Sequence, residues 1–210
     1  MLREIQRHPG VVYAALVPNL RGAEQAIESG ADRLNLVMSA SESHNLSNLR
    51  MTPGQSFEAL AGVAAVARDA GVPVNVSLSC SFGCPMKGDV SIATVMHWCE
   101  RHVDELGAQG ITLCATTGMA FPSQVHELTT AFRARWPEQS LTLHFHNTRG
   151  LGMGNVLAAI DAGAGPLRQH PGRAGWLSLY ARCFRQRVHG RGGPWPGAHG
   201  VRHRCGPGSA

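Results

Sequence analysis

The feature that most constrains the fold is a regular alternation of short apolar runs with longer amphipathic segments, most of which end at glycine. Short apolar runs predict strands, and segments with one apolar stripe at helical spacing predict helices. The polar segment between residues 39 and 52 predicts a loop. The expected strands are residues 11–17, 33–38, 73–80, 111–114 and 140–146, and the expected helices are residues 21–29, 56–70, 91–106, 123–136 and 151–162.

Five strand–helix units in succession predict an α/β fold, with a parallel sheet and right-handed crossovers. A doubly wound open sheet and a (β/α)8 barrel both fit this pattern. The first strand is not followed by G-x-G-x-x-G, the mark of a dinucleotide fold. Polar residues gather after the strands, where a barrel builds its active site. Because a full barrel needs eight units in about 250 residues, this chain predicts an incomplete (β/α)8 (TIM) barrel.

The charge of the chain is divided between two regions. Residues 1–164 hold 11 basic and all 14 acidic residues, a net charge of −3. Residues 165–210 hold eight Arg, no Lys and no acidic residue, with 10 of the 25 Gly and 5 of the 12 Pro. We therefore expect a partial-barrel domain at residues 1–164 and an Arg/Gly/Pro-rich tail without a fixed fold at residues 165–210.

Several classes of protein are excluded by composition. No run approaches the roughly 18 apolar residues of a membrane span, and the N-terminal residues lack the apolar core of a secretory signal. Six Cys in 210 residues do not form a disulfide scaffold. We expect a cytoplasmic protein with reduced thiols.

The sharpest local motif is L-H-F-H-N-T-R-G, which holds His144 and His146. Alternate residues of a strand face the same side, so the two imidazoles are expected to point together, with Phe145 opposite. Two imidazoles at a strand end suit a divalent cation and leave positions open for other ligands. Hydrogen bonds at a barrel rim explain the pair equally well.

Other candidates have a structural explanation that outweighs the functional one. The spacing of Cys80 and Cys84 resembles a zinc half-site, but no second pair follows, which favours packing for Cys80 and a loop position for Cys84. Residues 41–44 could hold a nucleophile and a base, yet ordinary loop polarity explains them. Cys99 and His102 fit packing or surface positions in a helix. The glycines of residues 150–154 give a weak signal for phosphate binding.

Five ordered runs carry a family resemblance: Y-A-A-L-V-P-N-L-R-G, S-A-S-E-S-H-N, V-S-L-S-C-S-F-G-C-P, T-T-G-M-A-F-P and H-F-H-N-T-R-G-L-G. Together they cover about residues 9–164 and resemble hydroxymethylglutaryl-CoA lyase. That family belongs to the metal-dependent barrel lyases and synthases related to isopropylmalate synthase. The S-C-S-F-G-C-P segment favours the lyase over its synthase relatives.

The resemblance implies a (β/α)8 barrel whose strands 3–7 correspond to the five units here. It also implies Mg²⁺ or Mn²⁺ bound by His144 and His146, an acyl-CoA substrate, a role in leucine degradation and a homodimer. The implied reaction is a retro-Claisen cleavage of 3-hydroxy-3-methylglutaryl-CoA to acetyl-CoA and acetoacetate. It implies no membrane partner and no specific nucleic acid.

Departures from the family pattern predict lost activity. The family's first-strand Arg-Asp pair and second-strand Glu have no counterpart in this sequence. Ala115 stands where the resemblance places an Asp, and Phe121 stands where it places an Asn. The family's C-terminal Cys and Asn are also unmatched, so no catalytic residue is assigned. Three hypotheses follow: a lyase completed by another chain, an inactive fragment, and a binding module that uses the basic tail.

The tail itself suggests a shifted reading frame. Residues 167–169, 172–180, 184–188 and 202–207 can each be encoded so that a one-base shift reads a family motif, in the family's order. A GC-rich gene read out of frame gives Arg, Gly, Pro and Ala, which matches the tail. The alternative is an evolved basic segment for nucleic acid. The gene sequence distinguishes the two, because a stop codon in the shifted frame excludes the shift.

Overall fold

The computed structural model describes residues 2–164, and the expected tail lies outside the described residues. None of the helices in the described part combines the length and apolar character that a bilayer crossing requires. The strands are β1 (Ala14–Val17), β2 (Arg33–Ser39), β3 (Val74–Ser79), β4 (Gly110–Ala115) and β5 (Ser140–Phe145). The α-helices are α1 (Leu20–Glu28), α2 (Glu42–Leu49), α3 (Pro53–Asp69), α4 (Ile92–Glu100), α5 (Pro122–Arg135) and α6 (Gly152–Ala159), and the short turns are η1 (Leu2–Glu4), η2 (Arg101–Glu105) and η3 (Ile160–Ala164).

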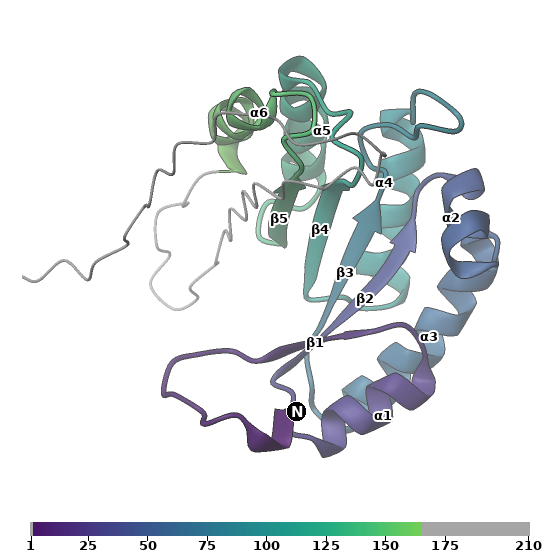
Figure 1. Ribbon diagram of the computed structural model, residues 1–210, viewed down its shortest axis with the longest axis vertical. Coiled ribbons are helices and arrows are strands. Elements are labelled where there is room, and N and C mark those ends of the chain that lie inside the picture. The colour runs from purple at the N-terminus through teal and green to yellow at the C-terminus, as the bar shows by residue number, and fades with distance from the viewer. Residues whose placement is uncertain (1, 165–210) are drawn as a thin grey trace, which may run out of the picture.

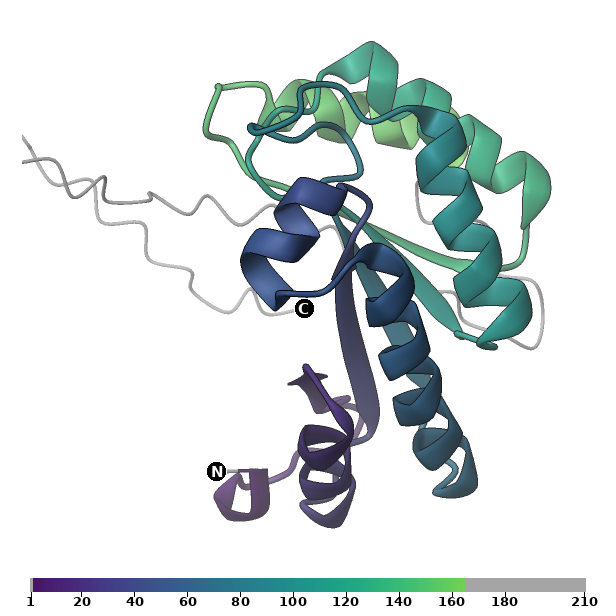
Figure 2. The same ribbon diagram turned by 90° about the vertical axis from the view of Figure 1, so that its right-hand side faces the viewer.

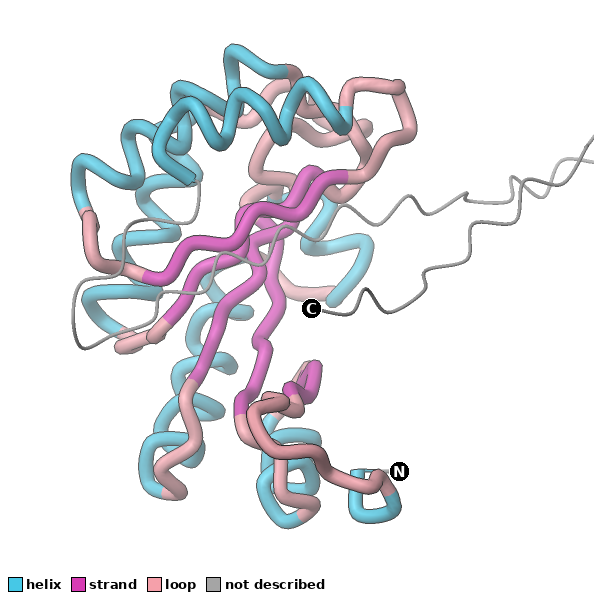
Figure 3. Tube along the Cα trace, turned by 90° about the vertical axis from the view of Figure 1, so that its left-hand side faces the viewer, coloured by secondary structure: helices cyan, strands magenta, loops and turns pink. Residues whose placement is uncertain are grey.

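The five strands form one parallel sheet in the order β1-β2-β3-β4-β5. A doubly wound sheet would reverse its strand order at a switch point, whereas a barrel keeps the order of the chain. The helices of the described residues lie on one side of the sheet, and none of them covers the other side (Figures 1 and 3). The described residues therefore form an α/β fold that is an incomplete (β/α)8 barrel, as the sequence predicts.

The core lies between the sheet and the helices. In β2, Leu34, Leu36 and Met38 are buried, whereas the alternate residues Asn35 and Val37 are only half-buried on the other face. The same alternation runs through β3 and β5, whereas in β4 every residue except Thr112 is buried. Outside the sheet, α1 packs on α3 and α5 packs on α6 (Figure 2). One face of the sheet is thus apolar and covered, and the opposite, concave face carries polar side chains.

The predicted loop at residues 39–52 is wrong, because it contains helix α2. The buried side chain of Asn45 holds this helix in place. Its Oδ1 accepts the N–H of Ser39 at 2.9 Å, and its Nδ2 donates to Met51 O at 2.8 Å and to Ser56 Oγ at 2.7 Å. Ser and Asn are typical of loops because they bond to nearby backbone, but here Asn45 makes those bonds from within a helix.

Two further boundaries differ from the sequence expectation. The first strand is shorter than residues 11–17, and Leu16 within it is 67% exposed. In the described part of the chain, β1 pairs with β2 alone, so it is an edge strand with little to bury its side chains. The helix expected at residues 91–106 is α4 followed by η2, a π-helical turn.

His102, in that π-helical turn, is fully buried. Its Nδ1 lies against the carbonyl oxygen of Trp98, and its ring packs edge-on against Phe57 with ring centroids 5.4 Å apart. Its Nε2 has no hydrogen-bond partner among residues 2–164. Burial lowers the pKa of His102 to about 4. The folded protein therefore holds this ring neutral near pH 7.

Acid is expected to destabilise the fold through His102. The unfolded chain binds this proton below pH 6.5, but the folded chain does so only near pH 4, so the folded state loses stability as the pH falls between those values. The expected loss is about 2 kcal/mol between pH 7 and pH 5. Urea unfolding at both pH values measures it. The His102→Met protein should lose less stability than wild type between these pH values. Equal losses in the two proteins would contradict the role assigned to His102.

Candidate functional site

The two candidate ligands converge at the carboxyl end of β5. His144 lies in the strand, opposite Cys114 of β4, and His146 follows the strand's last residue. Their Nε2 atoms are 3.0 Å apart, so one ring N–H donates to the other ring nitrogen. The intervening Phe145 is buried on the opposite face, where its ring lies 5.8 Å from that of Phe82. The structure therefore confirms that the two imidazoles point together.

The separation of the two ring nitrogens fits adjacent ligands of a single divalent cation. Mg²⁺ binds its ligands at about 2.0–2.1 Å in octahedral geometry, so two adjacent ligand atoms lie about 3 Å apart. The separation of the Nε2 atoms of His144 and His146 already matches that value. Ligation requires that both nitrogens lose their protons. Among residues 2–164, however, no group of three or more His, Cys, Asp or Glu side chains is placed to hold a metal.

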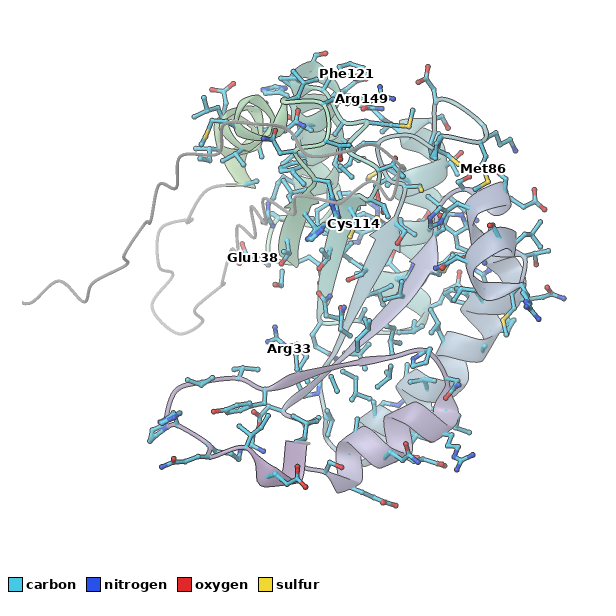
Figure 4. The ribbon with its side chains drawn as sticks, in the orientation of Figure 1. Arg33, Met86, Cys114, Phe121, Glu138 and Arg149 are labelled. Carbon is cyan, nitrogen blue, oxygen red and sulfur yellow. The ribbon has the colours of Figure 1, made fainter. Side chains whose placement is uncertain are left out.

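The imidazoles border a hollow of about 510 Å³ on the concave face of the sheet. Polar side chains form a hydrogen-bonded row along it. Asn75 Nδ2 donates to Asn35 Oδ1 and, at 3.0 Å, to Thr112 Oγ1, and Ser77 Oγ donates to Asn35 Oδ1 at 3.0 Å. Such a surface suits a ligand rich in oxygen. In Figure 4, Arg33 and Cys114 mark two positions along this lining, which also includes Ala14, Leu16, Val37, Ser79, Thr116 and Thr142.

Sequence reasoning missed this polar row. Its members lie inside the apolar runs V-N-V-S-L-S, R-L-N-L-V-M and I-T-L-C, where they alternate with buried residues. A polar residue at every second position of a strand indicates a second face that is not packed against apolar side chains. This two-residue period is the sequence signal that identifies the row.

Ala115 lies on the other face of its strand. Its neighbours Cys114 and Thr116 line the hollow, whereas Ala115 is 3% exposed and pairs in register with Phe145. The substitution at this position therefore alters the buried face beneath the site. It does not remove a side chain from the lining of the hollow.

Cys80 and Cys84 lie in the loop after β3. Cys80 and Cys84 are both buried, and Cys80 has a left-handed φ of 55°. Burial raises the pKa of Cys80 to about 11. Burial also opposes ionisation of Cys84, but hydrogen bonds, the largest of them from Ser41, lower the pKa of that thiol. The structure confirms packing for Cys80 and a loop position for Cys84, although residues 80–84 of that loop are buried.

The remaining candidates make contacts of their own. Ser41 Oγ lies 3.2 Å from Ser43 Oγ, and no hydrogen bond joins Ser41 to His44 in the part of the chain that the structure describes. Cys99 and His102 are buried packing residues, as expected. The glycine-rich stretch opens α6, where Gly152 N donates to Asn147 Oδ1 at 2.9 Å.

Comparison with known proteins identifies relatives along most of the chain. The family model described as HMGL-like matches residues 1–168. Hydroxymethylglutaryl-CoA lyase YngG of Bacillus subtilis is 40% identical over 159 residues, which are 76% of this chain and 53% of that protein. The (R)-citramalyl-CoA lyase of Chloroflexus aurantiacus is 40% identical over 151 residues, 72% of this chain and 47% of that protein.

A solved structure shows the same likeness in three dimensions. An HMG-CoA lyase from Acinetobacter baumannii, in complex with coenzyme A and 3-methylmalate, superposes with a TM-score of 0.73 at 45% sequence identity. The superposition covers 77% of this chain and 52% of that one. The chain thus spans about half the length of the relatives it matches. Because the family model and these relatives cover most of its residues, the chain belongs to the HMGL-like family.

Proposed function

We propose that this chain carries the metal-binding edge of an acyl-CoA lyase site. The proposed reaction is cleavage of 3-hydroxy-3-methylglutaryl-CoA to acetyl-CoA and acetoacetate. The observation that carries the proposal is the pair His144 and His146, with Nε2 atoms 3.0 Å apart at the edge of the hollow that the polar row lines. The pair lies at the carboxyl end of the strands, where barrel enzymes place their chemistry. Relatives named as HMG-CoA lyase and citramalyl-CoA lyase support the acyl-CoA class of substrate.

In this proposal the two imidazoles hold Mg²⁺ or Mn²⁺ beside the substrate. A bound divalent cation supplies stabilisation of the negative charge that develops on the substrate's oxygens. The hydroxyl of Thr116, which lines the hollow, accepts the N–H of Cys80 at 3.1 Å. Its own hydrogen therefore remains available to donate to a substrate oxygen.

We further propose that the 210 residues cleave the substrate poorly by themselves. Cleavage needs a base for the C3 hydroxyl proton and an acid for the acetyl-CoA enolate. The described lining of the hollow offers hydroxyls, amides and imidazoles, but no carboxylate. With two protein ligands in the described residues, binding of a hard cation is expected to be weak. The chain is thus proposed to be a lyase-family member whose own activity is impaired.

Titration with Mn²⁺ tests the metal site directly. The wild-type chain is expected to bind Mn²⁺, and His144→Ala is expected to raise the Kd at least about tenfold, because one of two imidazole ligands is lost. His126→Ala is the matched control, since His126 is an exposed imidazole whose Nε2 lies 3.4 Å from Asp161 on the helical side of the molecule. Free Mn²⁺ measured by electron paramagnetic resonance gives the Kd. Equal affinity of wild type and His144→Ala would refute the proposed site.

A further inference from the structure

The two imidazoles of the proposed site are held by different means. His144 belongs to β5, and its backbone is fixed by pairing with Cys114 of β4. The paired register ends at Phe145, one residue before His146. The sheet therefore fixes the first ligand, whereas the position of the second depends on whatever packs against the chain after β5.

The residue that packs there is Gly118, in the loop after β4. A β-carbon on Gly118 would lie 2.7 Å from Thr148 Oγ1, 2.9 Å from Thr148 Cβ and 3.0 Å from the carbonyl oxygen of His146. All three distances are at or below the closest contacts that real β-carbons make. Gly118 also has a φ of +69°, which favours glycine. The backbone at His146 thus lies against a surface that only glycine provides.

The loop that carries Gly118 is anchored on both sides. Before it, Thr116 Oγ1 accepts the N–H of Cys80 at 3.1 Å, which ties the loop to the end of β3. After it, the buried side chain of Asn155 on α6 donates to Ala120 O at 3.0 Å. In Figure 4, Phe121 and Arg149 mark the loops after β4 and β5. Because the Gly118 loop is fixed, crowding at Gly118 would displace the chain that carries His146.

We propose that Gly118 is a positioning residue that sets the separation of the His144 and His146 Nε2 atoms, and through it the affinity for a divalent cation. The inference rests on the proposed function, since it concerns the same imidazole pair. The separation of 3.0 Å suits two adjacent ligands of one ion. If a methyl group at position 118 pushed His146 away, the two Nε2 atoms would no longer be separated by the distance that one ion requires. His144 would stay in place.

The test compares two glycines under equal backbone strain. Gly118→Ala in the full chain is expected to raise the Kd for Mn²⁺ about 10- to 100-fold, the usual effect of disturbing groups that orient metal ligands. Gly71→Ala is the matched control, because Gly71 has a φ of +67° and a β-carbon there would have no atom within 4 Å. Its Kd is expected to stay within about twofold of wild type. Equal Kd values for the two variants would overturn the inference.

A second substitution separates crowding from strain. Thr148→Gly in the Gly118→Ala background removes two of the three crowding atoms, and is expected to recover most of the lost affinity. No recovery would overturn the inference, because the loss would then come from backbone strain at position 118. Thermal unfolding of each variant shows which of them are folded.

A metal-free measurement keeps this result distinct from the failure of the proposed function. The imidazole ¹⁵N resonances of His144 and His146 report whether the two rings still share a proton. They are expected to shift in Gly118→Ala and to stay unchanged in Gly71→Ala. If wild type binds no Mn²⁺ through His144, the proposed metal site fails, yet these resonances still decide whether Gly118 positions His146. Unchanged resonances in Gly118→Ala would overturn the inference.

Discussion

The 210-residue chain is expected to release acetyl-CoA from 3-hydroxy-3-methylglutaryl-CoA at least about 1,000-fold more slowly than a full-length relative under the same conditions. The lining of the described hollow holds no carboxylate to act as a base. A missing acid or base alone costs about 10²–10⁴ in rate, and missing charge stabilisation costs about 10²–10³. An acetyl-CoA release assay with Mg²⁺ measures the rate.

The Bacillus subtilis lyase is a suitable reference, because it is 40% identical to this chain over the shared region. In the 210-residue chain, His144→Ala should lower any remaining rate of acetyl-CoA release further, since it removes a proposed metal ligand. Turnover within tenfold of the reference would contradict the proposed impairment. It would mean that the 210 residues contain an acid and a base that neither the hollow nor the family motifs identify.

The His pair could be predicted from the sequence because its geometry is local. Residues two apart on a strand face the same side whatever the strand packs against. The sequence therefore predicts that His144 and His146 point together, with Phe145 opposite. The parallel sheet followed from repetition of the same local units, since each strand–helix pair constrains the next one.

Gly118 could not be recognised in this way. Its requirement for glycine arises from Thr148 and the carbonyl oxygen of His146, which belong to the next strand's loop. Helix α2 was missed for a similar reason, because Asn45 bonds across to Ser56 on the following helix. In both places the deciding contact joins two elements, and a pattern read along one element does not contain it.

Replacement of Asn45 by Ala is expected to lower the free energy of unfolding by about 3–5 kcal/mol. The side chain is fully buried. It forms hydrogen bonds with the N–H of Ser39, the carbonyl of Met51 and the hydroxyl of Ser56. Ser39 and Ser56 are themselves 2% exposed, so water cannot replace the lost partner without opening the core. Each buried polar group left unpaired costs about 1–3 kcal/mol. Urea unfolding at pH 7 measures the change.

Asn48→Ala is the matched control, because Asn48 is exposed on the same helix and its replacement should change stability by no more than about 0.5 kcal/mol. The double variant Asn45→Ala/Ser56→Ala should be less unstable than the sum of its single changes, since removing both partners leaves fewer buried groups unpaired. If Asn45→Ala instead behaves like Asn48→Ala, then α2 is held by its own helical bonds. The Ser- and Asn-rich sequence of this segment would then form a helix without help from the core.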